Sequence, residues 1–457
     1  MQISKKGILA GILILYTIAV ACHLATSYNV ISISPLFLAA LRVSCIIPTV
    51  YYAFKKKSLT TWIMVSMIIG IEVGYDFPNF GIHLKVVSQI FLRLIKTIIA
   101  PLLFSTLALG IAGHSDMKQL GRLAWKSILY FEIVTTIALI IGLVAINLTQ
   151  AGTGITLPVN ENPEKLTVQN QTWQDVVLHI FPENIAKAIA EGHILQIVVF
   201  SILFGIGLAM VKTGPKQTML RALESLSEVM FKFTSIVMHT APFAVGAAIA
   251  YTVSHIGVGI LLNLFNLLAT LYLALTFLLL FVFVPIALIF KVPLKKFISA
   301  ISEPVSLAFA TTSSEAALPI AMEALEKKMG VPRKIVAFVM PMGYSFNLDG
   351  STLYLSLASV FLAQAAGIPF SIEQQIIMVL TLMLTSKGVA GIPRATLVVL
   401  LGTAASFGLP IEPIFLILGI DELMDMARSA VNVIGNCLAT MVIARTEAPE
   451  TVESPVN

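Results

Sequence analysis

Long apolar runs constrain the fold of this chain more than any other feature. They occupy residues 7–25, 31–53, 59–79, 88–112, 122–149, 192–211, 225–255, 259–290, 298–325, 331–366, 372–408 and 411–444, the last four with interruptions. A helix crosses a bilayer with about 20 apolar residues. Only 12% of the residues are charged, compared with about 25% in soluble domains. Because a helix satisfies its own backbone hydrogen bonds in lipid, we predict an all-α polytopic membrane protein.

Basic residues between these runs set the orientation of the chain. When the N-terminal lysines and the cluster at 55–57 are placed in the cytoplasm, the other basic loops also fall inside. This holds only if segments 298–325 and 372–408 do not cross the membrane. We therefore expect these two segments to be re-entrant hairpins that enter from opposite sides. Both chain termini are then expected in the cytoplasm.

The last four apolar runs form two similar units. In each, an apolar hairpin with a tip of small residues precedes a helix with a polar break or a polar stripe. The tips are 311–319 and 385–394, the break is 345–351 and the stripe is 421–436. Inverted repeats with irregular backbone are typical of secondary transporters, which bind substrate near the midplane of the bilayer. We therefore predict a transport site in this half of the chain.

The polar stripe places ionisable groups at membrane depth. Asp425, Arg428, Asn432 and Asn436 recur at steps of three and four residues, so they share one helix face. Each ionisable side chain at that depth costs roughly 2.5–3.5 kcal/mol, and such residues face a protein interior or a water-filled cavity. The stripe is therefore either a binding surface or an internal salt bridge that only holds helices together.

The residue types in the stripe suggest a ligand. The planar guanidinium of Arg428 matches a carboxylate with two hydrogen bonds. Asp425, three residues earlier, can bind an ammonium group. Ser313 and Ser314 in the first tip can hold a second carboxylate through backbone and hydroxyl donors. An acidic amino acid satisfies all three contacts.

A second polar group interrupts segment 331–366. Unwinding at Asn347 and Asp349 would free carbonyl oxygens and, with the carboxylate, make an all-oxygen shell that suits a hard cation. The alternative is a glycine kink at Gly350 with Asp349 paired to a neighbouring helix. Glu132, inside another apolar run, is either a proton site or cation ligand beside Thr135 and Thr136, or a structural hydrogen bond between helices.

From about residue 59 to 445 the chain resembles the dicarboxylate/amino acid:cation symporters, the glutamate transporter family. The resemblance rests on the tip Thr312–Pro319, the break Asn347–Ser351, the tip Ser386–Pro393 and the stripe Asp421–Asn436, in family order and spacing. It implies about eight transmembrane helices plus two re-entrant hairpins, assembled as a homotrimer. It also implies a mobile transport domain that moves like an elevator against a scaffold, with the second hairpin as the extracellular gate.

The resemblance also implies roles for individual residues. Arg428 corresponds to the arginine that binds the side-chain carboxylate of the substrate, and Asp425 to the acid that binds its amino group. Further substrate contacts are implied for Ser313, Ser314, Ser351, Ala390, Gly391, Ser429 and Asn432. Sodium ligands are implied at Gly343, Ser345, Asn347, Asp349, Thr135, Thr136, Ser386, Asn432 and Asn436.

Several positions depart from the patterns of particular branches of the family. Asn436 stands where those members have an aspartate ligand, and an amide offers an oxygen but no charge. Glu132 stands where archaeal relatives have a tyrosine. Together these two residues favour the proton-coupled bacterial branch. Leu355 stands where proton-carrying animal relatives have an acid, so that route is absent here. We expect coupling to protons, sodium or both.

The sequence divides into four parts. Residues 1–58 lie outside the resemblance and are expected to form two extra membrane helices, a peripheral hairpin or membrane anchor in which Arg42 needs a polar partner or a route to the interface. Residues 59–290 are expected to be mostly scaffold and trimerisation helices with parts of the transport domain. Residues 291–445 are the expected transport-domain core, and 446–457 a cytoplasmic tail.

The combined prediction is a secondary active symporter of acidic amino acids, glutamate or aspartate, in the cell (inner) membrane. It needs no cofactor besides its coupling ions and has no nucleic-acid partner. The alternative is a C4-dicarboxylate carrier, which Asp425 disfavours because a dicarboxylate has no ammonium group. A neutral amino acid carrier is disfavoured by Arg428. An enzyme is not expected, because no Ser/His pairing or metal-ligand cluster is visible.

Overall fold

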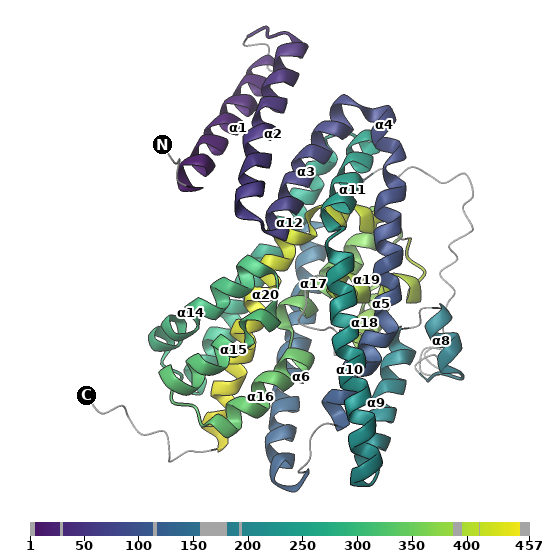
Figure 1. Ribbon diagram of the computed structural model, residues 1–457, viewed down its shortest axis with the longest axis vertical. Coiled ribbons are helices and arrows are strands. Elements are labelled where there is room, and N and C mark those ends of the chain that lie inside the picture. The colour runs from purple at the N-terminus through teal and green to yellow at the C-terminus, as the bar shows by residue number, and fades with distance from the viewer. Residues whose placement is uncertain are drawn as a thin grey trace. The chain divides into compact units, whose positions relative to one another are not determined.

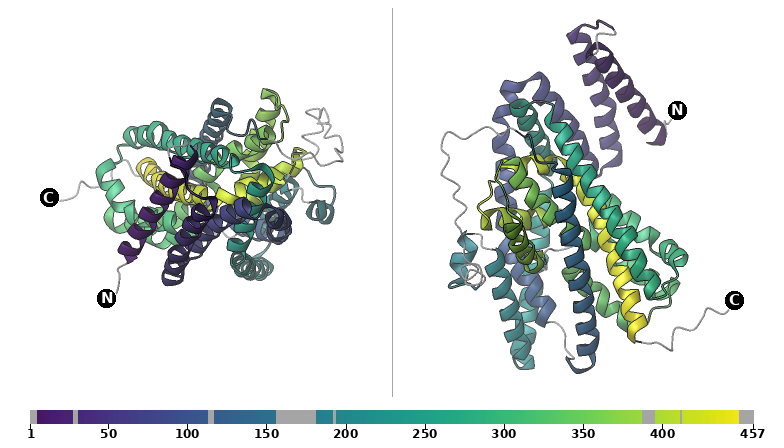
Figure 2. Two further views of the ribbon diagram at one scale, coloured as in Figure 1. Left: turned by 90° about the horizontal axis from the view of Figure 1, so that it is seen from above. Right: turned by 180° about the vertical axis from the view of Figure 1, so that it is seen from behind.

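The computed structural model describes residues 5–27, 31–112, 117–155, 181–191, 194–386, 395–410 and 412–447, and within these ranges it contains helices and turns but no strand (Figures 1 and 2). In this part of the chain six helices are long and apolar enough to cross a membrane, or seven if Thr213–Met238 and Ala241–Ile256 together form one span. The prediction of an all-α polytopic membrane protein is therefore confirmed. The count of eight spans and the re-entrant insertion of the two hairpins remain predictions.

The chain divides into two compact units. Met1–Leu94 and Ser235–Leu261 form the first unit, and Ile95–Thr234 and Leu262–Asn457 form the second. The first unit contains α1 (Lys5–Ser27), α2 (Pro35–Lys56), α3 (Leu59–Asp76), α4 (Pro78–His83), the start of α5 (Lys85–Ala112), the end of α10 (Thr213–Met238) and α11 (Ala241–Ile256).

Small residues bring α3 and α11 into close contact within the first unit. A Cβ atom at Gly70 would overlap the backbone of Gly246, and one at Gly74 would overlap that of Ala250. The Ser254 hydroxyl donates to the Gly74 carbonyl at 3.2 Å. Gly70 and Gly74 form a GxxxG spacing, which lets membrane helices approach closely because no side chain separates their backbones.

The second unit is built around the long helix α20. Its elements are the rest of α5 and α10, α6 (Met117–Thr149), α8 (Ile185–Glu191), α9 (Ile194–Met210), α12 (Ile260–Leu278), η1 (Leu279–Phe283), α13 (Val284–Ile289), α14 (Leu294–Thr311), α15 (Ser314–Glu323), η2 (Ala324–Lys328), α16 (Arg333–Phe346), α17 (Asp349–Ala365), α18 (Ile372–Thr385), α19 (Ala395–Ser406) and α20 (Glu412–Glu447). Helix α20, yellow in Figures 1 and 2, packs against α14, α15, α16, α17 and α6.

Two interruptions of the helices lie at the polar break and at the first tip of small residues that the sequence analysis identified. Helix α16 ends at Phe346 and α17 begins at Asp349, with Asn347 and Leu348 outside both helices. Helices α14 and α15 are joined at Thr312 and Ser313, and Thr312 has a left-handed backbone (φ 53°). Of the tip of the second predicted hairpin, 385–394, only Thr385 and Ser386 are described, and 387–394 lie outside the described residues.

The π-helical segment η1 ends directly before α13. Pro285 in the first turn of α13 has no N–H group and cannot donate to the carbonyl four residues earlier. The N–H of Val284 instead donates to the carbonyl of Leu279, five residues earlier. This wider turn places Phe283 inside the unit, where it is 3% exposed.

Candidate functional site

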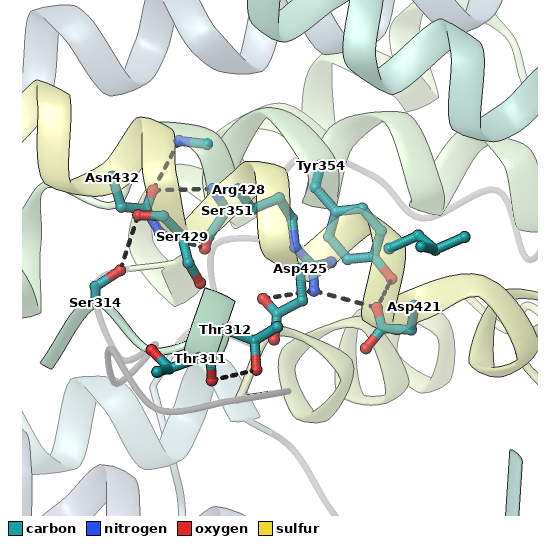
Figure 3. Close-up of polar contacts among 12 residues, drawn as sticks. Thr311, Thr312, Ser314, Ser351, Tyr354, Asp421, Asp425, Arg428, Ser429 and Asn432 are labelled. Atoms are coloured by element: carbon teal, nitrogen blue, oxygen red, sulfur yellow. Dashed lines mark hydrogen bonds and ion pairs between the residues drawn. The ribbon is translucent and has the colours of Figure 1, made fainter. Parts of the chain in front are cut away.

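Arg428 on α20 is the centre of a buried group of charges (Figure 3). Its Nη2 donates to Oδ1 of Asp421 at 3.1 Å and to Oδ1 of Asp425 at 2.9 Å. The guanidinium carbon lies 3.8 Å from the centre of the Tyr354 ring, and the Tyr354 hydroxyl donates to Asp421 at 3.3 Å. Asp421, Asp425 and Arg428 share a face of α20 because they are spaced at four and three residues.

The guanidinium keeps donors that the protein does not use. The Arg428 side chain is fully buried. Among the residues that the structure describes, its Nε and Nη1 have no hydrogen-bond partner. The contacts with the two acids fit the alternative of an internal ion pair, but they occupy only Nη2. The remaining donors leave room in the hydrogen-bonding scheme for an acceptor such as a carboxylate.

Asp421 and Tyr354 belong to this site but had no role in the prediction from sequence. Asp421 could have been found, because it lies two helical turns before Arg428 and therefore on the same face. Tyr354 lies on α17, far from Arg428 in the sequence. No pattern in the sequence indicates that its ring stacks on the guanidinium.

The turn between α14 and α15 brings the predicted serines to α20. The Ser314 hydroxyl donates to the Ser429 carbonyl at 3.3 Å, and Ser314 is buried. The Ser313 hydroxyl accepts from the N–H of Ala316 at 3.2 Å, so this residue caps α15. Ser429 directly follows Arg428 in the sequence, so the contact brings Ser314 of α15 close to the backbone next to Arg428 (Figure 3).

Asn432 connects α20 to the start of α17. Its Oδ1 accepts from the N–H groups of Gly350 at 2.8 Å and Ser351 at 3.2 Å, and its Nδ2 donates to the Ser351 hydroxyl at 3.0 Å. Leu348, the residue before α17, makes no side-chain cap. The first N–H groups of a helix need an acceptor from outside the helix, and Asn432 supplies it. This contact brings two of the predicted substrate residues, Ser351 and Asn432, together.

A second polar cluster joins the break before α17 to α20. The Asn347 Nδ2 donates to Oδ2 of Asp349 at 3.1 Å and to Oδ1 of Asn436 at 3.2 Å, and all three residues are buried. A Cβ atom at Gly343 would overlap the Asn436 amide oxygen, and one at Gly435 would overlap the Asp349 carboxylate. Glycine at both positions therefore lets these oxygens lie against neighbouring backbone.

The predicted residues of α6 lie on a helix that packs against α16, α17 and α20. A Cβ atom at Gly343 would touch the Phe131 ring, which places this turn of α6 next to the second cluster. The hydroxyl of Thr135 donates to the Phe131 carbonyl, and that of Thr136 to the Glu132 carbonyl, both at 2.7 Å. Their hydroxyl hydrogens are thus used within α6.

The remaining predicted residues lie near the ends of α16 and α18. Ser345 is in the last turn of α16. Ser386 follows the end of α18, and its buried hydroxyl has no hydrogen-bond partner in the described part of the chain. Ala390 and Gly391 lie outside the described residues.

Several helices are long and apolar enough to cross a bilayer, a polar break separates the shorter helices α16 and α17, and a buried arginine lies between two acids. Together these features define a membrane transporter as the class of protein. Comparison with known proteins agrees with this class. The chain matches the sodium:dicarboxylate symporter family over residues 59–446, and it belongs to that family.

The match to several named relatives covers almost the whole length of each relative. It is 41% identical over 403 residues to the proton/sodium-glutamate symport protein of Geobacillus stearothermophilus, covering 86% of this chain and 95% of the relative. It is 41% identical over 409 residues to the proton/glutamate-aspartate symporter of Escherichia coli (strain K12), covering 86% and 93%. It is also 39% identical over 400 residues to the C4-dicarboxylate transport protein of Bacillus subtilis (strain 168), covering 86% and 94%.

Proposed function

We propose that this protein is a secondary active symporter for acidic amino acids, glutamate or aspartate, in the cell (inner) membrane. The observation that carries the proposal is the buried Arg428, whose Nη2 is shared by two carboxylates while Nε and Nη1 have no partner among the described residues. Two carboxylates and one guanidinium leave one negative charge in excess when all three are ionised. Such a site favours a ligand that brings both a carboxylate and an ammonium group.

The ligand would bind across Arg428 and Asp425. Its side-chain carboxylate accepts from one of the two remaining donors of Arg428, Nε or Nη1, which lie on different edges of the guanidinium, and its ammonium group binds the Asp425 carboxylate. Its α-carboxylate binds at the turn before α15, where Ser314 already contacts α20. The other proposed substrate contacts are Ser313, Ser351, Ala390, Gly391, Ser429 and Asn432.

A C4-dicarboxylate is the alternative substrate, because a relative with that name is 39% identical. A dicarboxylate offers Arg428 an acceptor but offers Asp425 no cation. It would therefore add two negative charges to a buried site that already has one in excess, which is unfavourable in a medium of low dielectric constant. Relatives named for glutamate or for glutamate and aspartate agree better with this charge balance.

The coupling ion is proposed to bind at the second polar cluster. Asn347, Asp349 and Asn436 offer oxygens of the type that sodium binds. The further proposed ligands are Gly343, Ser345, Thr135, Thr136 and Asn432, with Ser386 at a separate site under the second hairpin. Because Asn436 contributes no charge, Asp349 supplies the negative charge of the cluster, and Glu132 is the proposed site of a coupled proton.

The proposed mechanism moves a transport domain against a scaffold. Residues 291–445 form the core of the transport domain, 59–290 supply mostly scaffold and trimerisation helices, and 446–457 form a cytoplasmic tail. The segment 372–408 is the proposed extracellular gate of a homotrimer whose chain termini lie in the cytoplasm. Coupling requires that the gate closes only over the full load, which is a difference in binding between the open and closed states.

Uptake by purified protein in liposomes tests this function. Sodium and proton gradients are imposed separately, and the uptake of radiolabelled L-glutamate, L-aspartate and succinate is measured. We expect at least one of the two amino acids to accumulate against its gradient when one of the ion gradients is imposed. Arg428→Ala should abolish this uptake, and Arg428→Lys should lower it strongly because an ammonium has no planar set of donors that can serve the two acids and a substrate carboxylate together.

Two outcomes would contradict the substrate assignment. One is succinate uptake that exceeds that of both amino acids. The other is an Asp425→Asn variant that binds glutamate or aspartate more tightly than the wild type, because loss of the acid should remove the ammonium contact. Arg93→Leu is a suitable control, since Arg93 is an exposed basic residue on α5 and has no role in the proposed site.

A further inference from the structure

Arg42 places a guanidinium within the apolar part of α2, a helix of the N-terminal extension whose other charged residues, Lys55 and Lys56, lie in its last turn. A charged group at membrane depth needs a partner or a path to water. The Nε of Arg42 donates to Oε2 of Glu72 at 2.8 Å, and its Nη2 donates to Oδ1 of Asp76 at 2.7 Å. The guanidinium carbon also lies 5.0 Å from the centre of the Tyr75 ring. Arg42 therefore has two acidic partners and one aromatic neighbour, all on α3.

Helix α3 has two faces with different chemistry. Gly70 and Gly74 pack against α11. Glu72 and Asp76 follow each glycine by two residues, which turns them about 200° around the helix axis. These acids are four residues apart and form one acidic face, directed away from the glycine contact. Without a basic neighbour, that face would present two carboxylates to lipid.

The α2 helix contributes one basic group to this contact and little other charge along its apolar length. Near the turn between the two helices, Phe54 of α2 contacts Trp62 of α3. The ring centres lie 4.8 Å apart in an edge-to-face arrangement. Large apolar side chains elsewhere on α2 are exposed, including Leu36 and Ile47. The charge on α2 is thus directed to α3, while its exposed surface suits lipid.

The family match begins at residue 59. Glu72 and Asp76 therefore lie inside the matched segment, whereas Arg42 lies outside it. We propose that Glu72 and Asp76 form a docking site for a basic membrane helix, and that α2 occupies this site through Arg42. The extension α1–α2 is then a built-in accessory element of the first unit and not a loosely attached anchor. This inference does not depend on which solute or ion the protein transports.

Native Cys45 provides a direct test of docking. It lies one turn after Arg42, is fully buried and is one of three cysteines in the chain. In full-length protein with Cys22→Ala and Cys437→Ala, the rate at which N-ethylmaleimide modifies Cys45 in detergent reports how often α2 leaves its neighbours. We expect Arg42→Leu to raise this rate about tenfold, the factor for losing a partly buried ion pair of intermediate strength.

A double-mutant cycle separates the proposed contact from general damage. Glu72→Gln with Asp76→Asn should raise the labelling rate as Arg42→Leu does. Combining all three substitutions should raise it no further, because the same interaction has been removed from both sides. Arg93→Leu, which removes an exposed basic residue from α5, should leave the rate unchanged.

The proposal is overturned if monodisperse Arg42→Leu protein labels at the wild-type rate, since apolar packing alone would then hold α2. It is also overturned if the effects of the two sets of substitutions multiply in the triple variant, because Arg42 and the acids would then act independently. Labelling does not require transport, so failure of the proposed transport function leaves this test intact.

Discussion

At the scale of single residues, the arrangement around Arg428 leaves binding capacity unused. Its Nη2 is shared by Asp421 and Asp425, and its Nε and Nη1 have no partner among the described residues. A buried donor without an acceptor costs about 1–3 kcal/mol. A carboxylate that accepts from one of these nitrogens would recover part of this free energy on binding. The same residue can therefore hold the two acids through Nη2 and select the ligand through its remaining donors.

Tyr354 holds the plane of this guanidinium through its ring. We predict that Tyr354→Leu weakens binding of the transported amino acid about 2- to 30-fold, because a desolvated cation–π contact contributes about 0.5–2 kcal/mol. Tyr354→Phe keeps the ring and loses only the hydrogen bond to Asp421, so its effect should be smaller. Isothermal titration calorimetry with L-glutamate and L-aspartate measures the Kd of each variant and of the wild type. Equal losses in the two variants would show that the hydroxyl, and not the ring, is the important group.

Asn436 adds an amide oxygen but no charge to the second polar cluster. Asn436→Asp adds a carboxylate beside Asn347 and Asp349, so we predict stronger sodium binding. Sodium that binds only the folded state raises its stability according to its concentration relative to Kd. The melting temperature should therefore rise more from choline chloride to sodium chloride in Asn436→Asp than in the wild type. Asn436→Ser, which stays neutral, is the control, and an equal sodium response in all three proteins would refute the prediction.

At the scale of elements, interrupted helices place the polar groups. The break between α16 and α17 puts Asn347 and Asp349 at a helix end, where backbone and side-chain groups need partners from elsewhere. Helix α20 provides these partners through Asn432 and Asn436. The start of α17 is therefore tied to the helix that carries Arg428, and the two polar clusters share the same pair of elements.

Close contact between α17 and α20 depends on Gly350. A Cβ atom at this position would overlap the backbone of Arg428, and backbone cannot move aside as a side-chain end can. We predict that Gly350→Ala lowers stability by about 1–3 kcal/mol, the usual range for overpacking. The matched control is Gly207→Ala on α9, where a Cβ atom meets nothing within 4 Å. Thermal unfolding in detergent compares them, and equal melting temperatures would contradict the prediction.

At the scale of the whole molecule, the extension and the candidate site belong to different units. The first unit contains α1, α2 and α3, and the second contains Arg428 and both polar clusters. The family match covers 59–446 and so includes the whole candidate site but not α1 and α2. The extension is thus expected to affect the stability of the first unit more than the chemistry of substrate binding.

Removing residues 1–57 tests this expectation. The truncated chain keeps Glu72 and Asp76 but loses Arg42, so we predict a lower melting temperature and a lower yield of monodisperse protein. Adding Glu72→Gln and Asp76→Asn to the truncated chain should restore part of the loss, because neutral side chains are less costly in lipid. A truncated protein as stable as the full-length chain would show that the extension does not support the first unit.

The sequence was sufficient for features that depend on one segment at a time. Apolar runs predicted an all-helical membrane protein, and the group at 345–351 predicted the break between α16 and α17. It also indicated that Arg42 needs a partner. It could not identify Glu72 and Asp76 as that partner, or Tyr354 as the neighbour of Arg428, because these residues look ordinary in their own helices.

Each membrane segment must form its own backbone hydrogen bonds and must contain few charged residues. These requirements produce long apolar runs that can be recognised in the sequence alone. The class of protein, the helical segments and the face shared by Asp425 and Arg428 followed from that pattern. Which side chains meet across helices depends on how the segments pack, and many packings satisfy the same apolar pattern. Only the tertiary structure therefore decided that Asp421 and Tyr354 hold Arg428, and that Asn432 and Asn436 join α20 to the break before α17.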